Sequence, residues 1–221
     1  MRQIAVIGLG NFGSAFAKRC QEQGNEVLGI DSRKDVVQEL GEQLSKVVHA
    51  DGRDMRILKD LGLSDYDLAV VSFGQVIEAS TLTTLHLKSL GVKEIYVKAI
   101  SDDHARILEL VGATRVIHPE REMAEKLAMS VSRPNIVDYL PLMDGFSLLE
   151  IRSPKDFHGR NLVELDLRRR FGITVIAIYK RITKMKFLAP GPSYTIGEED
   201  DMVLLGETTD VQKFQSSLQE E

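Results

Sequence analysis

Short apolar runs alternate with longer segments that are apolar on one face, from the start of the chain to about residue 132. Each run has the length of a buried strand, and the segments between them repeat apolar residues every three or four positions, as helices do. The alternation predicts right-handed crossovers and a mostly parallel sheet, for which six strands make a complete dinucleotide-type fold. The strands expected are Gln3–Ile7, Glu26–Ile30, Lys46–Ala50, Leu68–Ser72, Glu94–Ala99 and Arg115–Ile117.

A change of pattern near residue 135 predicts a domain boundary. Glu120–Ser132 has the apolar stripe of a helix, and this helix should end before Pro134 because proline disfavours a helical residue before it. We therefore expect a first domain over residues 1–135, with the boundary near Asn135, and a second domain over residues 136–221.

The second domain is expected to be a small α+β unit. Its last helix should begin at Thr209, which with Gln212 has the spacing of a capping box. The predicted fold class is thus α/β, a Rossmann-type doubly wound parallel sheet with a second, smaller α+β domain. The other elements expected in it are a helix over Asn161–Arg170 and strands at Phe146–Ile151, Ile173–Tyr179, Met185–Leu188, Tyr194–Ile196 and Met202–Leu205.

Composition narrows the range of partners. The formal net charge is −5, which does not favour nucleic acid because binding needs cations that neutralise phosphates. Cys20 is the single cysteine, so a disulfide or a cysteine zinc cluster within one chain is not expected. The N-terminus lacks the long apolar stretch of a secretory signal, and no run is long enough to span a bilayer. The expected location is the cytoplasm.

A glycine-rich turn is the strongest local signal for chemistry. It follows a predicted strand and opens a helix, with the sequence Gly8-Leu9-Gly10-Asn11-Phe12-Gly13. Gly8 permits the tight turn, Gly10 lets backbone N–H groups approach a phosphate, and Gly13 lets the helix pack close to the strand. The N-terminus of the helix then presents free N–H groups to an anion.

A carboxylate at the end of the second strand supports nucleotide binding. Asp31 lies 23 residues after Gly8, where an acid can accept hydrogen bonds from both ribose hydroxyls. The same charge would repel a 2′-phosphate and so argues against NADP. The alternative is that Asp31 only caps the helix that follows it. Its neighbours Ser32 and Arg33 are included among the expected nucleotide-binding residues.

The ends of the third and fourth strands should line the same crevice. Ligands of open α/β sheets bind beyond the carboxyl ends of the strands, at the edge where Asp51-Gly52 and Ser72-Phe73-Gly74 are expected. These residue types are also common in ordinary loops, which is the alternative. We find no pattern of a catalytic nucleophile, base or metal ligand, and none of the five histidines belongs to a recognised motif. Binding without catalysis is the better interpretation, and an NAD-dependent oxidoreductase is the alternative.

Residues 1–135 resemble the regulator-of-potassium-conductance (RCK, or TrkA-N) N-terminal domain of Trk/Ktr-type bacterial potassium uptake systems, and residues 136–218 are similar to the C-terminal domain (TrkA-C) of the same subunits. The matching segments are residues 6–13, 30–31, 79–85, 96–99 and 116–120. The resemblance implies a cytosolic regulatory subunit that forms dimers and an octameric ring on the inner face of a membrane-embedded potassium channel subunit. Nucleotide exchange would gate that channel. A nucleotide sensor for another cation transporter is the alternative.

The resemblance also implies roles for single residues. Gly8–Gly13 would hold the phosphates of ATP or ADP, with AMP and NAD(H) as alternatives, and Lys98 would lie near the crevice. Glu120 would help to bind Mg²⁺ or Ca²⁺ at the nucleotide phosphate. The alternative is that Glu120 only stabilises the first turn of a helix through the helix dipole. Asn11 stands where relatives often have a phosphate-reaching arginine, which leaves the preference for a triphosphate open.

A second nucleotide site is implied in the C-terminal domain. Some Gram-positive relatives bind cyclic di-AMP there, between two protomers. Arg168 falls at a matching arginine and Pro190 near a matching proline, whereas Thr174 stands where an asparagine is expected. The alternative is that Arg168 is part of a solvated helix end.

Overall fold

The computed structural model describes residues 1–132, 136–142 and 145–218. The chain divides into two compact units, Met1–Glu120 and Arg121–Glu221, and each is described by itself. The boundary expected near Asn135, and the Pro134 that motivates it, lie outside the described residues, so that boundary stays a prediction. None of the helices in the described ranges is long and apolar enough to cross a membrane.

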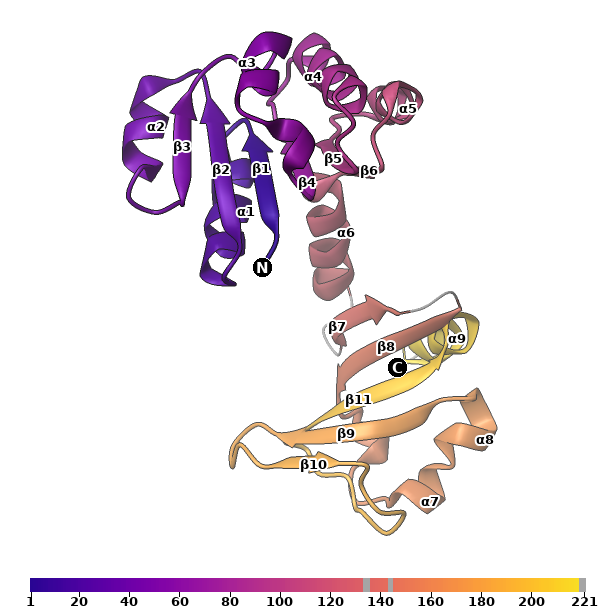
Figure 1. The fold of residues 1–221 in the computed structure, drawn as a ribbon. Helices are drawn as coiled ribbons and strands as arrows, with labels where there is room; N and C mark the ends of the chain where they lie inside the picture. The colour runs from indigo at the N-terminus through magenta and orange to yellow at the C-terminus, as the bar shows by residue number, and fades with distance from the viewer. Residues whose placement is uncertain (133–135, 143–144, 219–221) are drawn as a thin grey trace. The chain divides into compact units, whose positions relative to one another are not determined.

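The first unit is built on one parallel sheet of six strands in the order β3-β2-β1-β4-β5-β6 (Figure 1). This order confirms the predicted doubly wound fold. The chain leaves β1 toward one edge and returns through β4 to the other, which puts the switch of direction between β1 and β4. The strands are β1 (Gln3–Ile7), β2 (Glu26–Asp31), β3 (Lys46–His49), β4 (Leu68–Val71), β5 (Glu94–Lys98) and β6 (Arg115–Ile117).

Helices cover both faces of this sheet because alternate strand residues point to opposite sides. Ile4 and Val6 join one core with α1 (Asn11–Glu22) and α2 (Lys34–Leu40). Ala5 and Ile7 join a second core on the other face, to which three helices contribute: α3 (Met55–Asp60), α4 (Ile77–Ser89) and α5 (Asp102–Val111). Both faces are apolar, which explains why the strands appear in the sequence as continuous apolar runs.

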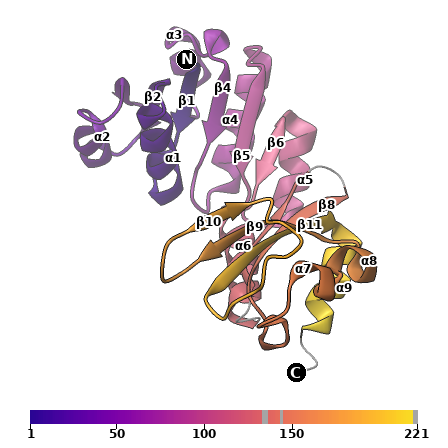
Figure 2. The same cartoon turned by 90° about the horizontal axis from the view of Figure 1, so that it is seen from below.

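The second unit contains α6 (Pro119–Ser132) from Arg121 on and an antiparallel five-stranded sheet in the order β10-β9-β11-β8-β7. Helix α9 packs against β8 and β11, and α8 lies beside α9 (Figure 2). The first strand of the unit, β7, was not among the expected strands. The elements are β7 (Ile136–Pro141), β8 (Phe146–Arg152), α7 (Leu162–Leu165), α8 (Leu167–Phe171), β9 (Thr174–Lys180), β10 (Lys186–Leu188), β11 (Asp200–Glu207) and α9 (Thr208–Ser217).

Three expected elements of this unit differ in the structure. The helix expected over Asn161–Arg170 is two short helices, because Asp166 between them has a left-handed backbone with φ 43°. The strand expected at Tyr194–Ile196 is reduced to a single bridge between Asn161 and Thr195. The predicted capping box at the last helix is wrong, since α9 begins after Glu207 with no side-chain cap. A capping box forms instead at the start of α7, between Asn161 and Glu164.

Candidate functional site

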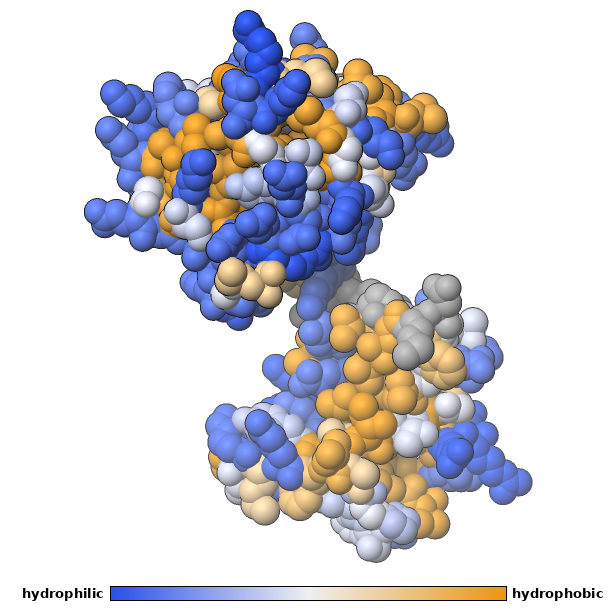
Figure 3. Space-filling model, viewed as in Figure 1, coloured by the Kyte–Doolittle hydropathy of each residue, from blue (hydrophilic) through white to orange (hydrophobic). Residues whose placement is uncertain are grey.

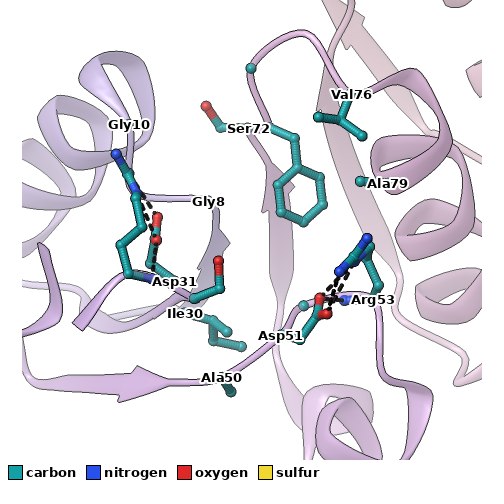
Figure 4. Close-up of a pocket in the computed structure, with 15 residues that line it drawn as sticks. Gly8, Gly10, Ile30, Asp31, Ala50, Asp51, Arg53, Ser72, Val76 and Ala79 are labelled. Atoms are coloured by element: carbon teal, nitrogen blue, oxygen red, sulfur yellow. Dashed lines mark hydrogen bonds and ion pairs between the residues drawn. The ribbon is translucent and has the colours of Figure 1, made fainter.

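A cleft of about 420 Å³ opens beyond the carboxyl ends of β1 to β4, at the switch point of the sheet (Figure 4). Most of the expected nucleotide-binding residues line it: Gly8, Gly10, Asp31, Ser32, Arg33, Asp51, Gly52, Ser72, Phe73 and Gly74. The structure adds residues that sequence reasoning did not include: Ile30, Ala50, Arg53, Val76 and Ala79. The cleft thus has an apolar part and, at Asp31–Arg33 and Asp51–Arg53, two charged parts.

Gly8 and Gly13 fix the tight geometry of the glycine loop. Gly8 has φ 92°, and a Cβ there would lie 2.6 Å from the carbonyl oxygen of Ser72. A Cβ on Gly13 would lie 2.0 Å from the carbonyl oxygen of Gly8. Neither position accepts a side chain without a backbone shift, because the atoms it would meet belong to the main chain. The loop therefore holds the start of α1 directly against the ends of β1 and β4.

Gly10 leaves the N-terminus of α1 open toward the cleft. It is the N-cap residue, it makes no side-chain cap, and a Cβ there would have no neighbouring atom within 4 Å. The first N–H groups of a helix have no partner within the helix, and they carry its positive end. The first turn contains no acidic residue that could compensate for them. This end of the cleft is therefore suited to an anion.

The remaining residues of the motif contribute main chain or packing rather than side chains in the cleft. Leu9 is buried in the core, and its side chain packs so closely on Gly29 that a Cβ there would meet it. Phe12 stacks on Phe16 with ring centroids 6.1 Å apart. Asn11 is exposed at the first position of α1. Leu9, Asn11, Phe12 and Gly13 do not line the cleft.

Asp31 is a buried carboxylate at the end of β2, and only 6% of its side chain is exposed. One oxygen accepts a hydrogen bond from the Leu9 N–H at 2.7 Å, and the other accepts one from the Arg33 N–H at 2.8 Å. Burial raises the pKa of Asp31, but the hydrogen bonds from Arg33 and Leu9 outweigh it and hold the pKa below the ordinary value of 3.8. Asp31 therefore stays ionised at neutral pH.

Arg53 is a cleft residue that the sequence interpretation missed. Its guanidinium forms an ion pair with Asp51 at 2.7 Å, and its backbone N–H donates to the same carboxylate at 3.0 Å. The hydrogen bond from the Arg53 side chain lowers the pKa of Asp51 against the effect of burial. The spacing Asp-x-Arg is the same at Asp31 and Arg33, so this repeated spacing was the signal that could have identified Arg53.

Gly52 lets three elements meet behind the cleft. A Cβ there would lie 2.3 Å from Ile7 of β1 and 3.2 Å from the Phe73 ring. The buried Thr83 hydroxyl of α4 donates to the Gly52 carbonyl at 3.0 Å. Gly52 is therefore required for close packing of the loop after β3, whatever the cleft binds.

Lys98 and Glu120 are brought together, but they do not line the cleft. The Lys98 ammonium donates to the Glu120 carboxylate, and 14% of the lysine side chain and 69% of the glutamate side chain are exposed. This hydrogen bond lowers the pKa of Glu120. The described ranges contain no group of three or more His, Cys, Asp or Glu residues that could hold a metal ion. A cation at Glu120 stays a prediction.

The residues matched to a second nucleotide site lie on separate segments of the second unit. Arg168 is exposed in α8, Thr174 is exposed at the first position of β9, and Pro190 is half-buried in the loop after β10. The cyclic di-AMP site stays a prediction.

Comparison with known proteins identifies both domains. The TrkA-N domain family model matches residues 4–119, and the TrkA-C domain model matches residues 147–219. The Ktr system potassium uptake protein C of Bacillus subtilis is 39% identical over 214 residues, which cover 97% of this chain and 96% of that protein. The Ktr system potassium uptake protein A of the same organism is 35% identical, with 97% and 96% covered.

Solved structures support the fold. The chain aligns with the GsuK channel bound to NAD at a TM-score of 0.70 and 17% identity, over 98% of this chain and 39% of the channel. A GsuK structure bound to ADP aligns at a TM-score of 0.54 and 17% identity, over 61% of this chain and 35% of that one. The chain thus spans well under half of these channel proteins. From its two domains in order and its nearly full-length relatives, the chain belongs to the TrkA-N/TrkA-C family that includes the Ktr system potassium uptake proteins.

Proposed function

We propose that the cleft of the first unit binds an adenine nucleotide, and that the chain is a regulatory subunit which gates a membrane potassium uptake system. The observation that supports this most strongly is the buried, ionised Asp31 at the same cleft as the uncapped start of α1. An open helix N-terminus attracts an anion, and an ionised carboxylate at the end of the second strand is placed to accept hydrogen bonds from ribose hydroxyls. A nucleotide presents a diol and a phosphate to these two features at once.

The residues of the cleft fit the parts of such a ligand. Asp31 would accept hydrogen bonds from the ribose hydroxyls, and the loop at Gly8 and Gly10 would donate main-chain N–H groups to phosphate. The apolar part of the cleft, with Ala50 and Ala79, would contact the base. The nucleotide is not a substrate in this proposal. Its binding changes which conformation of the protein is more stable.

Several adenine nucleotides remain candidates. ATP and ADP are proposed first, with AMP and NAD(H) as alternatives, and the GsuK structures bound to NAD and to ADP support this range. The negative charge of Asp31 disfavours a 2′-phosphate. Asn11 adds no positive charge to the glycine loop, so affinity for the third phosphate of ATP would depend on Mg²⁺ or Ca²⁺. Glu120 would ligate that cation only if its ion pair with Lys98 broke and the metal took the place of the ammonium group.

Gating requires an assembly and a partner. We propose that the chain forms homo-oligomeric rings at the inner face of the membrane, bound to a channel subunit; its relatives are named as potassium uptake proteins of the Ktr system. Apolar side chains exposed on both units support self-association (Figure 3). Two nucleotides can switch such a ring only if they bind its two conformations with different affinities.

The test is a calorimetric titration of the purified chain with ATP, ADP, AMP, NAD⁺ and NADH, each with and without Mg²⁺, and with cyclic di-AMP. We expect saturable binding of at least one adenine nucleotide and no change in nicotinamide absorbance over time. Turnover of NADH would favour the oxidoreductase alternative. The absence of binding to the whole panel would contradict the proposal.

A further inference from the structure

The Asp31 carboxylate has no acceptor position left for a ribose. Its Oδ2 accepts from the Leu9 N–H at 2.7 Å and from Nη2 of Arg33 at 3.1 Å. Its Oδ1 accepts from the Arg33 N–H at 2.8 Å and from Nε of Arg33 at 3.0 Å. A carboxylate offers about four lone-pair positions, and all of them are in use. A diol can bind only if one or two of these donors leave.

The two kinds of donor differ in how easily they can leave. The Leu9 and Arg33 N–H groups belong to the main chain between the sheet and its helices, so they keep the carboxylate in place. The two remaining donors belong to the Arg33 guanidinium, and 55% of that side chain is exposed. Only the arginine side chain can withdraw without a change in the backbone, since it can exchange the carboxylate for water.

We infer that the Arg33 guanidinium competes with ribose for the Asp31 carboxylate, and that a ligand with a cis-diol displaces it. The inference rests on the proposed nucleotide-binding function. Ribose can bind only when the two Arg33 hydrogen bonds break, and breaking them costs free energy. Arg33 therefore lowers the affinity for ribonucleotides. A dideoxy ligand has no hydroxyl to place on Asp31 and leaves the arginine where it is.

The pair at Asp51 provides a matched control inside the same cleft. Arg53 donates its N–H and its guanidinium to Asp51 with the same two-residue spacing. Asp51 is much more open, with 44% of its side chain exposed against 6% for Asp31. Water can therefore reach the Asp51 carboxylate. Arg53 does not compete for a buried acceptor in the way that Arg33 does.

The experiment is a calorimetric titration of ADP and of 2′,3′-dideoxy-ADP into the wild-type chain, Arg33→Ala and Arg53→Ala. We expect Arg33→Ala to bind ADP about three- to tenfold more tightly, because the competing charged hydrogen bonds are gone. Its affinity for the dideoxy ligand should stay within about twofold of the wild-type value. Arg53→Ala should change the affinities for both ligands by the same factor. A thermal unfolding scan of each variant verifies that it is folded.

Three outcomes would overturn the inference, and they can be told apart. If Arg33→Ala weakens ADP binding, the arginine is a ligand contact and not a competitor. If it strengthens ADP and dideoxy-ADP equally, it acts on the cleft in general. In both cases the proposed function stands. If no adenine nucleotide of any kind binds to the wild-type chain, the proposed function fails as well.

Discussion

Single residues of the glycine loop have separable roles, although the motif presents them as one unit. Gly13 is constrained by packing, since a Cβ would lie 2.0 Å from the Gly8 carbonyl oxygen, whereas Gly10 has open space around it. The sequence predicted both roles from spacing alone. It could not show that Leu9 and Phe12 turn away from the cleft, because the direction of a side chain depends on the core that the whole unit forms.

These roles predict different effects of two alanine substitutions. Gly13→Ala should lower the free energy of unfolding by about 1–3 kcal/mol, because main-chain atoms must move apart. Gly10→Ala should cost less, about 0.5–1 kcal/mol, because it meets no neighbouring atom and alanine is only a poorer N-cap residue than glycine. It should still weaken nucleotide binding, since its methyl group takes the space next to the helix N-terminus. Urea unfolding and calorimetry measure the two effects. Equal loss of stability in both variants would contradict this division.

The Asp31 carboxylate also predicts a dependence of stability on pH. Its pKa is below 3.8 in the folded chain, so it contributes stability above about pH 4, and this contribution is lost as the pH falls through the folded-state pKa. Wild type should therefore lose more stability than Asp31→Asn between pH 5 and pH 3. Urea unfolding of both proteins across this range measures the difference. Parallel pH profiles would show that the carboxylate is not stabilised by its partners.

At the scale of elements, apolar patterning predicted the first unit well and the second unit less well. The central strands β1, β2 and β4 are buried over almost their whole length, so each gives a continuous apolar run. The break between α7 and α8 depends on one residue, Asp166, whose left-handed backbone no periodicity reveals. The edge strand β7 is partly exposed, its apolar residues do not alternate with polar ones, and its sequence includes the proline Pro141, so it gave only a weak signal.

Helices α4 and α5 are joined through a buried histidine. Nε2 of His104 lies 2.8 Å from the Ser80 hydroxyl, which itself donates to the Ile77 carbonyl at 2.9 Å. Nδ1 accepts from the Ile100 N–H at 3.4 Å. We infer a neutral ring that carries its proton on Nε2. Burial, and then the charge of His118, lower the pKa of His104 below 6.5.

This junction should weaken in mild acid. Because the unfolded chain takes up the proton first, His104 contributes stability above pH 6.5 that is lost as the pH falls toward the folded-state pKa. We expect the unfolding temperature to drop between pH 7.5 and pH 5.5, and to drop less in His104→Gln. Circular dichroism follows both transitions. An equal drop in the variant would assign the effect to other groups.

At the scale of the whole molecule, the second unit has an apolar groove that a monomer would leave in water. The groove has a volume of about 540 Å³ and lies between α6 and β7. Met123 and Leu127 on α6 are 56% and 57% exposed, and Leu140 on β7 is 53% exposed. Strand β7 is also an edge of its sheet. Apolar residues beside an open strand edge favour association with another chain.

Self-association should therefore depend on this groove. Light scattering coupled to size-exclusion chromatography should give a multiple of the mass of one chain for wild type. Met123→Glu together with Leu127→Glu should reduce that mass, while the unfolding temperature of the separated chains stays high because both side chains are already exposed. Val163→Glu, at a residue 64% exposed elsewhere on the unit, is the control. A monomeric wild type at all concentrations would contradict the oligomer.

The most direct test of the account is a calorimetric titration of ATP and ADP into wild type, Asp31→Asn and Asp51→Asn. Wild type should bind at least one of the two nucleotides. Asp31→Asn should bind it at least about tenfold more weakly, because a charged hydrogen-bond acceptor is lost, and Asp51→Asn should change the affinity far less. Unchanged binding by Asp31→Asn would contradict the account.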